Sequence, residues 1–231
     1  MGQTAVDAGT TGSAADLAAE IRERISSLPH RDTPSLRSVR REFSKRLKGS
    51  GPQMVLRLAR RLLDGADHDR RFIAYELIQF HKAALESLRE EELEELGRGI
   101  DSWGAVDTFS VYLAGPAWRE HQLSDDVILR WAESSDRWWR RTALVSTVAL
   151  NSKARGGDGD ARRTLLICRR LVSDRDDMVV KAMSWALREL AKRDPGAVVD
   201  FLAEHETSLA ARVNREVRNK LETGLKNPKK R

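Results

Sequence analysis

Apolar residues recur at spacings of three and four along almost the whole chain, and this periodicity restricts the fold more than any other feature. Such spacing places apolar side chains on one face of an α-helix. Runs of β-branched residues are short, and no Asn-Gly or Asp-Gly turn separates alternating apolar segments. About a dozen helices are predicted, at roughly 14–27, 34–48, 52–64, 69–83, 84–97, 102–114, 123–133, 136–151, 160–172, 176–192, 195–204 and 206–222. The sequence therefore predicts an all-α protein.

Turn-forming residues divide these segments into antiparallel pairs. The predicted breaks fall at Gly104, Gly115-Pro116, Gly156-Gly157 and Asp194-Pro195. A weak internal repeat supports the pairing, because several helices open with an aromatic or aliphatic residue, then a basic residue, then Ala. The matching core positions are Ala74, Val106, Ala143 and Ala182, which lie about 32 to 39 residues apart. We expect a HEAT-like solenoid of stacked helix pairs with a concave basic face.

Charge and cysteine content restrict the partners and the compartment. Lys and Arg number 41 against 35 Asp and Glu, so the net charge of +6 favours a polyanionic partner without requiring one. The single Cys168 excludes a disulfide framework, and the cytoplasm is the expected compartment, with the protein on the nucleoid when it binds DNA. No stretch approaches the roughly 18 apolar residues of a membrane span, so no membrane association is expected.

The expected domain organisation is simple. Residues 1–13 are rich in Gly, Thr and Ala, without a basic start or an apolar run, which predicts a disordered tail rather than a signal peptide. A single repeat domain is predicted over 14–224, followed by a basic tail over 225–231. One protein copy is expected to act alone as a monomer.

Trp103 and Asp107 are four residues apart and should project from one helix face, which sets an indole beside a carboxylate. This pairing suits a cationic substrate. The simpler interpretation buries Trp103 in the core and uses Asp107 as a cap or in a salt bridge. Because Ser102 is placed to be the N-cap, Asp107 lies beyond the first turn and is not needed for capping.

The segment 136–141 combines two tryptophans with three arginines at a helix start. Arg137 and Arg141 share a face, and guanidinium groups match phosphate oxygens in bidentate geometry. Both are therefore candidate DNA-binding residues. The alternative, a tryptophan in the core with solvated arginines, is expected to hold for Trp138 or Trp139 and for Arg140.

Lys181, Trp185 and Arg188 form a second basic and aromatic stripe, at positions i, i+4 and i+7 of one helix. Met183, Leu187 and Leu190 occupy the opposite side and are expected in the core. Trp185 is thus expected to be at least half exposed and available to a ligand. Further basic residues, Arg162-Arg163, Arg169-Arg170 and Lys226 to Arg231, could also touch DNA, although charge runs are usually solvated surface.

Several signatures of enzyme chemistry are absent from the sequence. There is no phosphate loop, no Gly-rich dinucleotide turn, no nucleophile elbow and no zinc motif, and the five histidines lack ligand spacing. No cofactor and no metal site are expected.

Three segments resemble the AlkD family of DNA alkylation-repair glycosylases: Trp103 to Asp107, Trp139 to Ala143, and Lys181 to Lys192. The resemblance extends over about residues 34–222. It implies HEAT-like repeats around duplex DNA, with Trp103, Asp107 and Trp185 as active-site residues and Arg141 facing the DNA. The chain departs from the family pattern at Ser26 to His30, and an extra loop, Ala154 to Ala161, lengthens the spacing between Arg141 and Trp185.

The resemblance implies excision of purines alkylated at N3 or N7 from double-stranded DNA, including bulky adducts if the enzyme serves in antibiotic self-resistance. Some relatives bind DNA without known glycosylase activity, and fold alone does not fix activity. One alternative is a non-catalytic protein that recognises distorted or branched DNA, against which Asp107 argues because a carboxylate repels phosphate. A second alternative is a protein-binding scaffold with the tryptophans as anchors. Salt-sensitive duplex binding would separate the scaffold from both DNA hypotheses.

Overall fold

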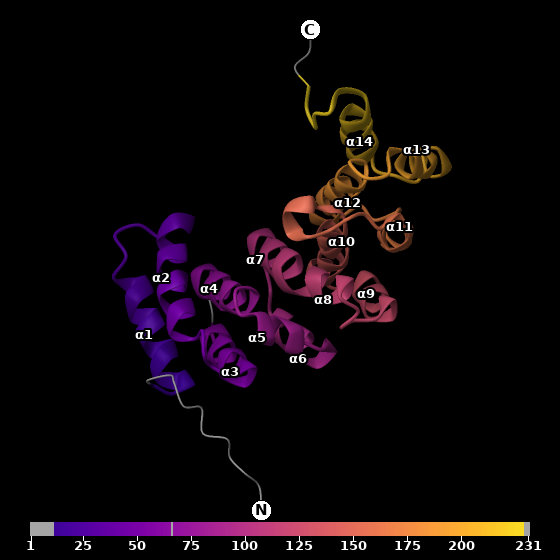
Figure 1. Ribbon diagram of the computed structural model, residues 1–231. Helices are drawn as coiled ribbons and strands as arrows, with labels where there is room; N and C mark the ends of the chain where they lie inside the picture. The colour runs from indigo at the N-terminus through magenta and orange to yellow at the C-terminus, as the bar shows by residue number, and fades with distance from the viewer. Residues whose placement is uncertain (1–11, 66, 229–231) are drawn as a thin grey trace, which may run out of the picture. The chain divides into compact units, whose positions relative to one another are not determined.

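The computed structural model describes residues 12–65 and 67–228, and all regular secondary structure in these ranges is helical (Figure 1). This confirms the all-α prediction. The chain divides into two compact units, one ending at Arg98 and the other beginning at Gly99. Most of the predicted N-terminal tail, and the last three residues of the basic tail, lie outside the described residues. The prediction of one domain over 14–224 stays a prediction.

The first unit is built from short antiparallel helices. They are α1 (Ala14–Ser26), α2 (Thr33–Arg46), α3 (Pro52–Leu63), α4 (His68–Gln79), α5 (Lys82–Ser87) and α6 (Glu90–Gly97). The side chains of Ser13, Asp32 and Asp67 cap the first, second and fourth of these helices by accepting backbone N–H groups. Helix α1 packs on α2 and α3, and α4 packs on α2 and α3. A predicted helix over 84–97 is interrupted at Leu88 and Arg89, where the backbone becomes extended.

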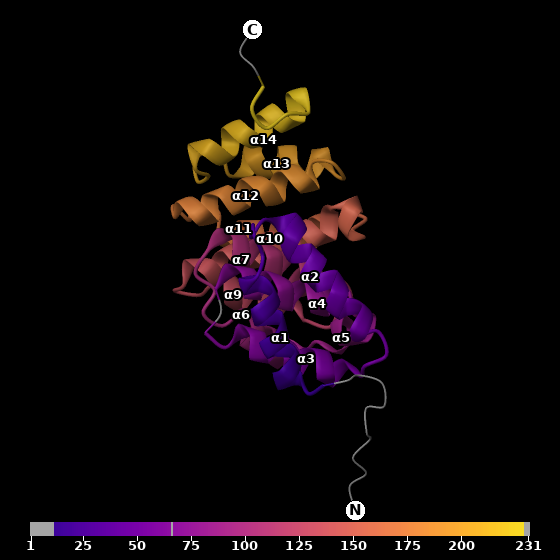
Figure 2. The same cartoon turned by 90° about the vertical axis from the view of Figure 1, so that its left-hand side faces the viewer.

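The second unit has two layers of helices. Its elements are α7 (Trp103–Phe109), a π-helical turn η1 (Ser110–Ala114), α8 (Gly115–Arg119), α9 (Asp125–Ala132), α10 (Arg137–Asn151), a 3-10 turn η2 (Lys153–Arg155), α11 (Ala161–Arg170), α12 (Asp177–Leu190), α13 (Pro195–Glu204) and α14 (Ala211–Thr223). Helices α7, α10, α12 and α14 pack in succession, while α9, α11 and α13 lie along their other side (Figure 1). Figure 2 shows α12 beneath α13 and α14.

The repeat register predicted from the sequence coincides with the core. Val106, Ala143 and Ala182 lie on the three successive helices α7, α10 and α12 and have no exposed surface, and Ala74 is equally buried in the first unit. Small side chains at these positions let consecutive helices approach closely. The same three helices carry every residue proposed for the site.

The predicted break at Gly115-Pro116 is wrong. The backbone stays helical from Trp103 to Arg119, and the π turn η1 widens the helix just before Pro116, whose missing N–H would interrupt a regular α-helix. The glycine serves packing instead. A Cβ atom at Gly115 would lie 2.6 Å from the Cβ of Ala149 and from the carbonyl oxygen of Ser146, both on α10. Gly104, another predicted break, also lies inside helix α7.

Candidate active site

Helix α7 presents Trp103 and Asp107 on the same side. The helix begins after Ser102, whose extended backbone makes it the N-cap, as predicted, although its side chain makes no capping hydrogen bond. Val106 and Phe109 bury the opposite face. The Trp103 side chain is 63% exposed, which is far outside the range of a core tryptophan. The interpretation of Trp103 as a core residue is therefore excluded, and its indole is open to a ligand.

Asp107 is held by a two-pronged ion pair with Arg141 of α10. The Nε atom of Arg141 donates to Oδ1 at 3.0 Å, and Nη2 donates to Oδ2 at 3.0 Å. Nη1 of the same guanidinium donates to the carbonyl oxygen of Met178 at 2.6 Å. This geometry fixes the plane of the carboxylate. Burial raises the pKa of Asp107, although the charge and hydrogen bonds of Arg141 act in the opposite direction.

A cleft of about 360 Å³ opens beside the Asp107 carboxylate, and we call it the Asp107 cleft. All of its lining belongs to the second unit. The lining residues are Asp107, Thr108, Val111, Tyr112, Val148, Ser152, Ala154, Arg155, Trp185 and Glu189. The carboxylate therefore shares its cleft with an indole from α12, and a cleft of this size is in the range of small-ligand sites.

A second cleft of about 430 Å³ lies on the other side of Trp185 and is rich in cations. This basic cleft is lined by Arg141, Lys181, Trp185, Arg188, Arg212, Glu216 and Lys226. The predicted stripe of Lys181, Trp185 and Arg188 thus faces one cleft, and Trp185 separates it from the Asp107 cleft. The predicted core side of α12, with Met183, Leu187 and Leu190, is buried as expected.

A buried carboxylate organises part of the basic cleft. Glu216 is 5% exposed, accepts a hydrogen bond from Ser184 Oγ at 2.6 Å and lies 3.4 Å from Lys226 Nζ. The same hydroxyl accepts from Arg188 Nε at 3.2 Å, and burial lowers the pKa of Arg188. Ser184 and Glu216 thus order Arg188 and Lys226, while Lys181 and Arg212 of the same cleft pair with Asp177 at 2.6 and 2.7 Å.

The arginines predicted on α10 do not form one exposed row. Arg137 is 52% exposed and lies over the Trp138 ring at 4.9 Å, with Asp176 3.6 Å away. Arg141, in contrast, is 5% exposed and engaged with Asp107. One turn of helix thus carries one arginine at the surface and one inside. Contact of either residue with DNA stays a prediction.

The remaining residues of this segment are structural. Trp139 packs against Trp131, with ring centroids 4.9 Å apart, which fits the expectation that one of the two tryptophans serves the core. Arg140 was expected to be solvated, but its Nε donates to Asp174 at 2.8 Å and its Nη1 donates to the carbonyl oxygen of Ser134. That expectation was wrong because Arg140 ties two inter-helix loops together.

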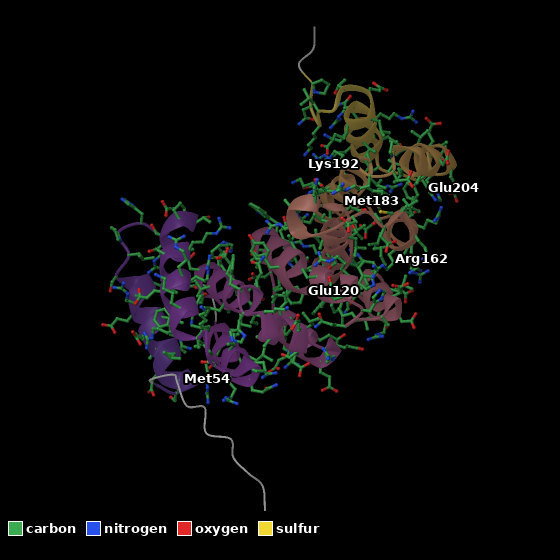
Figure 3. All side chains as sticks on the ribbon, viewed as in Figure 1. Met54, Glu120, Arg162, Met183, Lys192 and Glu204 are labelled. Atoms are coloured by element: carbon green, nitrogen blue, oxygen red, sulfur yellow. The ribbon has the colours of Figure 1, made fainter. Side chains whose placement is uncertain are left out.

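Other basic residues considered for DNA contact lie on α11, in the outer layer that α9, α11 and α13 form. Arg162 pairs with Asp125 at 3.0 Å, Arg169 with Glu204 at 3.4 Å, and Arg170 with Glu133 at 2.7 Å. Figure 3 shows Arg162 and Glu204 on the outer helices. None of these residues lines the Asp107 cleft or the basic cleft. Among the tail residues, Lys226 does line the basic cleft.

The two other charged residues of the Asp107 cleft, Glu189 and Arg155, were not predicted from the sequence. Glu189 is four residues after Trp185 on α12 and so shares its face, a spacing that could have revealed it. Arg155 lies in the loop from Ala154 to Ala161, which the sequence identifies only as an insertion. No periodic pattern marks a residue in a loop. Long-range folding, not local sequence, brings it to the cleft.

The fold and the site together define a class of protein: a helical-repeat protein with a half-buried, arginine-bound carboxylate, a half-buried indole that lines both the Asp107 cleft and the basic cleft, and a second, exposed indole on the helix of the carboxylate. The family model for DNA alkylation repair enzymes matches residues 17–221, and the chain belongs to that family. Its helical repeats are HEAT-like. Membership supports a role in DNA repair as an enzyme with DNA as its substrate. A search of curated proteins found no match.

Within 12–65 and 67–228, no helix is long and apolar enough to cross a membrane. In the same ranges, no group of three or more His, Cys, Asp or Glu side chains is arranged to hold a metal ion.

Proposed function

We propose that this protein is a DNA glycosylase that hydrolyses the N-glycosidic bond of N3- or N7-alkylated purines in duplex DNA. The observation that carries the proposal is the Asp107 carboxylate, fixed by Arg141 and facing a cleft that Trp185 lines. A carboxylate held in this way presents charge in a set place, which is the requirement for stabilising a cation that forms during a reaction.

The chemistry of an alkylated purine matches such a site. Alkylation at N3 or N7 gives the base a positive charge, so the C1′–N bond breaks with its electron pair passing to the base, which leaves neutral. The deoxyribose then carries oxocarbenium charge, which Asp107 stabilises electrostatically. Water adds its oxygen to C1′ and gives up one proton, which the carboxylate accepts or passes to solvent. No acid is needed to protonate the leaving base.

The indoles supply a second source of cation stabilisation. Trp103 and Trp185 offer π faces to the cationic nucleotide, an interaction of roughly 0.5 to 2 kcal/mol for each ring. Trp103 is largely exposed in the free protein, and Trp185 is half-buried between the two clefts. We propose that Trp103 contacts the DNA from the open side while Trp185 forms a fixed wall.

We propose a positioning role for Arg141 in place of phosphate binding, because its donors are directed to Asp107 and Met178. It also neutralises Asp107, so the carboxylate repels DNA less than the sequence suggested. Phosphate binding is assigned instead to Lys181 and Arg188 of the basic cleft and to the exposed Arg137.

We also propose that the lesion reacts without full enclosure of its base, so bulky adducts are included among the proposed substrates. We propose that a monomer acts on the nucleoid in the cytoplasm. Enclosure of a flipped base, the usual strategy of glycosylases, would exclude large adducts.

The test incubates wild type, Asp107→Asn and a control with duplexes that contain 7-methylguanine, 3-methyladenine or a bulky adenine adduct, and measures the released base. Asp126→Asn is the matched control, because Asp126 is an exposed aspartate on the outer helix α9. Release by wild type and by the control, but not by Asp107→Asn, supports the proposal. Tight binding without release of any base would contradict it and favour a non-catalytic protein that recognises distorted DNA.

A further inference from the structure

One wall of the Asp107 cleft is made by the segment that joins α10 to α11. Ser152, Ala154 and Arg155 of this segment all line the cleft. The segment forms the 3-10 turn η2, which ends at Gly156 in a left-handed conformation with φ of +81°. A residue with a Cβ atom is strained in that conformation, so the glycine fixes where the turn ends.

Two arginines hold the backbone of this wall: Arg119 at the end of α8 and Arg193 in the turn after α12. Arg119 Nη1 donates to the carbonyl oxygens of Arg155 and Ala149. Arg193 donates through Nε to the carbonyl oxygen of Asn151 at 2.8 Å and through Nη2 to that of Gly157 at 3.1 Å. The segment is therefore braced on both sides of η2, in contrast to a loop held only at its ends.

The Arg155 side chain rests on an aromatic ring of the same cleft. Its guanidinium carbon lies 4.7 Å from the centroid of the Tyr112 ring. Tyr112 is 8% exposed and belongs to the π turn η1, which fixes the ring. Stacking occupies the face of a guanidinium and leaves its N–H donors, which lie in its plane, able to bind a planar or tetrahedral anion.

Arg155 has no acidic partner among the described residues. The two carboxylates of the cleft are already engaged, Asp107 with Arg141 and Glu189 with Lys192 at 2.7 Å. Each of those pairs is neutral, so Arg155 supplies the net positive charge of the cleft. Many other arginines of the second unit, such as Arg162, are bound to acidic side chains.

We propose that Arg155 binds a DNA phosphate next to the nucleotide whose sugar faces Asp107. The inference rests on the proposed function and adds a substrate-binding residue to it. A phosphodiester brought toward Asp107 and Glu189 needs a cation on the protein side of the cleft, and Arg155 is the unpaired one. Binding there sets the strand so that the sugar lies between the carboxylate and the Trp185 wall.

The test compares Arg155→Ala and Arg155→Lys with Lys153→Ala, a control that removes the same charge from the same turn. Lys153 is exposed and does not line the Asp107 cleft. The dissociation constant is measured over a range of salt concentrations for a duplex with a tetrahydrofuran abasic-site analogue. This DNA has no base to release at the analogue, so the measurement does not depend on glycosylase activity.

We expect Arg155→Ala to bind this duplex about tenfold more weakly, the size of one lost charge-assisted hydrogen-bonded contact. The slope of log K against log salt should decrease by about 0.9, the value for one phosphate contact. Arg155→Lys should fall between wild type and Arg155→Ala, because it keeps the charge and loses the planar stack. Lys153→Ala should stay within about twofold of wild type, as expected for a residue without phosphate contact.

Equal affinity and salt slope for Arg155→Ala and Lys153→Ala would overturn the inference. Absence of base release by wild type, with the Arg155 effect on binding intact, would instead overturn the glycosylase proposal and leave the phosphate contact standing. The two failures are therefore distinguishable.

Discussion

Each unit of the molecule contains a carboxylate held by arginine, and the two sites differ in one respect. In the first unit, Glu76 of α4 is 1% exposed and is bound by Arg40 at 3.0 Å and by Arg37 at 2.9 Å, both from α2. In the second unit, Asp107 of α7 is bound by Arg141 of α10 but keeps 21% of its side chain exposed. The first carboxylate joins two helices, whereas the second also has a free edge in a cleft.

The comparison shows what separates a structural ion pair from a candidate site. Both pairs bridge two packed helices and require a buried arginine. The Glu76 cluster has two cations for one carboxylate and closes over it, so the arrangement can only hold helices together. The Asp107 pair has one cation, and its open edge meets Trp185 and the other residues of the cleft. A catalytic carboxylate needs such an open edge, because the substrate must reach it.

The largest effect is expected when the closed cluster is broken. Glu76→Gln leaves Arg40 buried without a counter-ion, and loss of one partner of a buried pair costs about 3 to 5 kcal/mol. Urea denaturation measures the free energy of unfolding. Base release per folded molecule should be unchanged, since Glu76 lies outside both clefts. If Glu76→Gln unfolded with the same urea midpoint as wild type, the cluster would not stabilise the fold.

The second prediction concerns the open pair. Arg141→Lys keeps a positive charge but loses the fork that fixes the carboxylate, so kcat for base release should fall about tenfold or more, an increase of ~1.4 kcal/mol in the barrier. The affinity for duplex DNA and its salt slope should not change. If Arg141 instead held a phosphate, as the sequence suggested, loss of the bidentate fork would weaken duplex binding several-fold and leave kcat close to wild type. Measurement of both quantities on one variant decides between the two roles.

The helical architecture could be predicted because local patterns in the sequence determine where helices form. Periodic apolar residues located the helices, and the spacing of Val106, Ala143 and Ala182 identified the stacked core positions. Trp103 and Asp107 were also accessible to such reasoning, because an i, i+4 spacing within one helix fixes their relation.

The partners of these residues could not be predicted in the same way. Arg137 and Arg141 look equivalent in the sequence, yet one is solvent-exposed and the other is buried against Asp107. Helix periodicity gives a face but not the depth at which the neighbouring helix covers it. Arg155 is harder still, because its place depends on Arg119 of α8 and on Arg193 in the turn after α12. Tertiary contacts of this kind produce no periodic pattern in the sequence.

A smaller effect is expected at the exposed indole. Trp103→Ala should lower kcat/KM roughly 2- to 30-fold, the range that corresponds to one cation–π contact of 0.5 to 2 kcal/mol. Its free energy of unfolding should stay within about 0.5 kcal/mol of wild type, as for other surface substitutions. A large loss of stability would show that Trp103 packs against the protein.

The smallest effect is a displacement of the pH profile. Burial raises the pKa of Asp107, so the carboxylate is lost by protonation at a higher pH than the ordinary value of about 3.9. Base release, corrected for spontaneous loss without enzyme, should therefore fall on the acid side with a midpoint above that value. Acidic pH lowers base release through this group, but it has the opposite effect on the contribution of Asp107 to the free energy of unfolding. A raised pKa means that the folded protein binds this proton more tightly than the unfolded chain, so the contribution favours folding at acidic pH and is lost as pH rises through the folded pKa. Arg141→Lys, with weaker contacts to the carboxylate, should move the midpoint of base release to a still higher pH. A midpoint at or below 3.9 in wild type would instead show that the arginine pair outweighs burial, and the open edge of Asp107 would then resemble solvent more than protein.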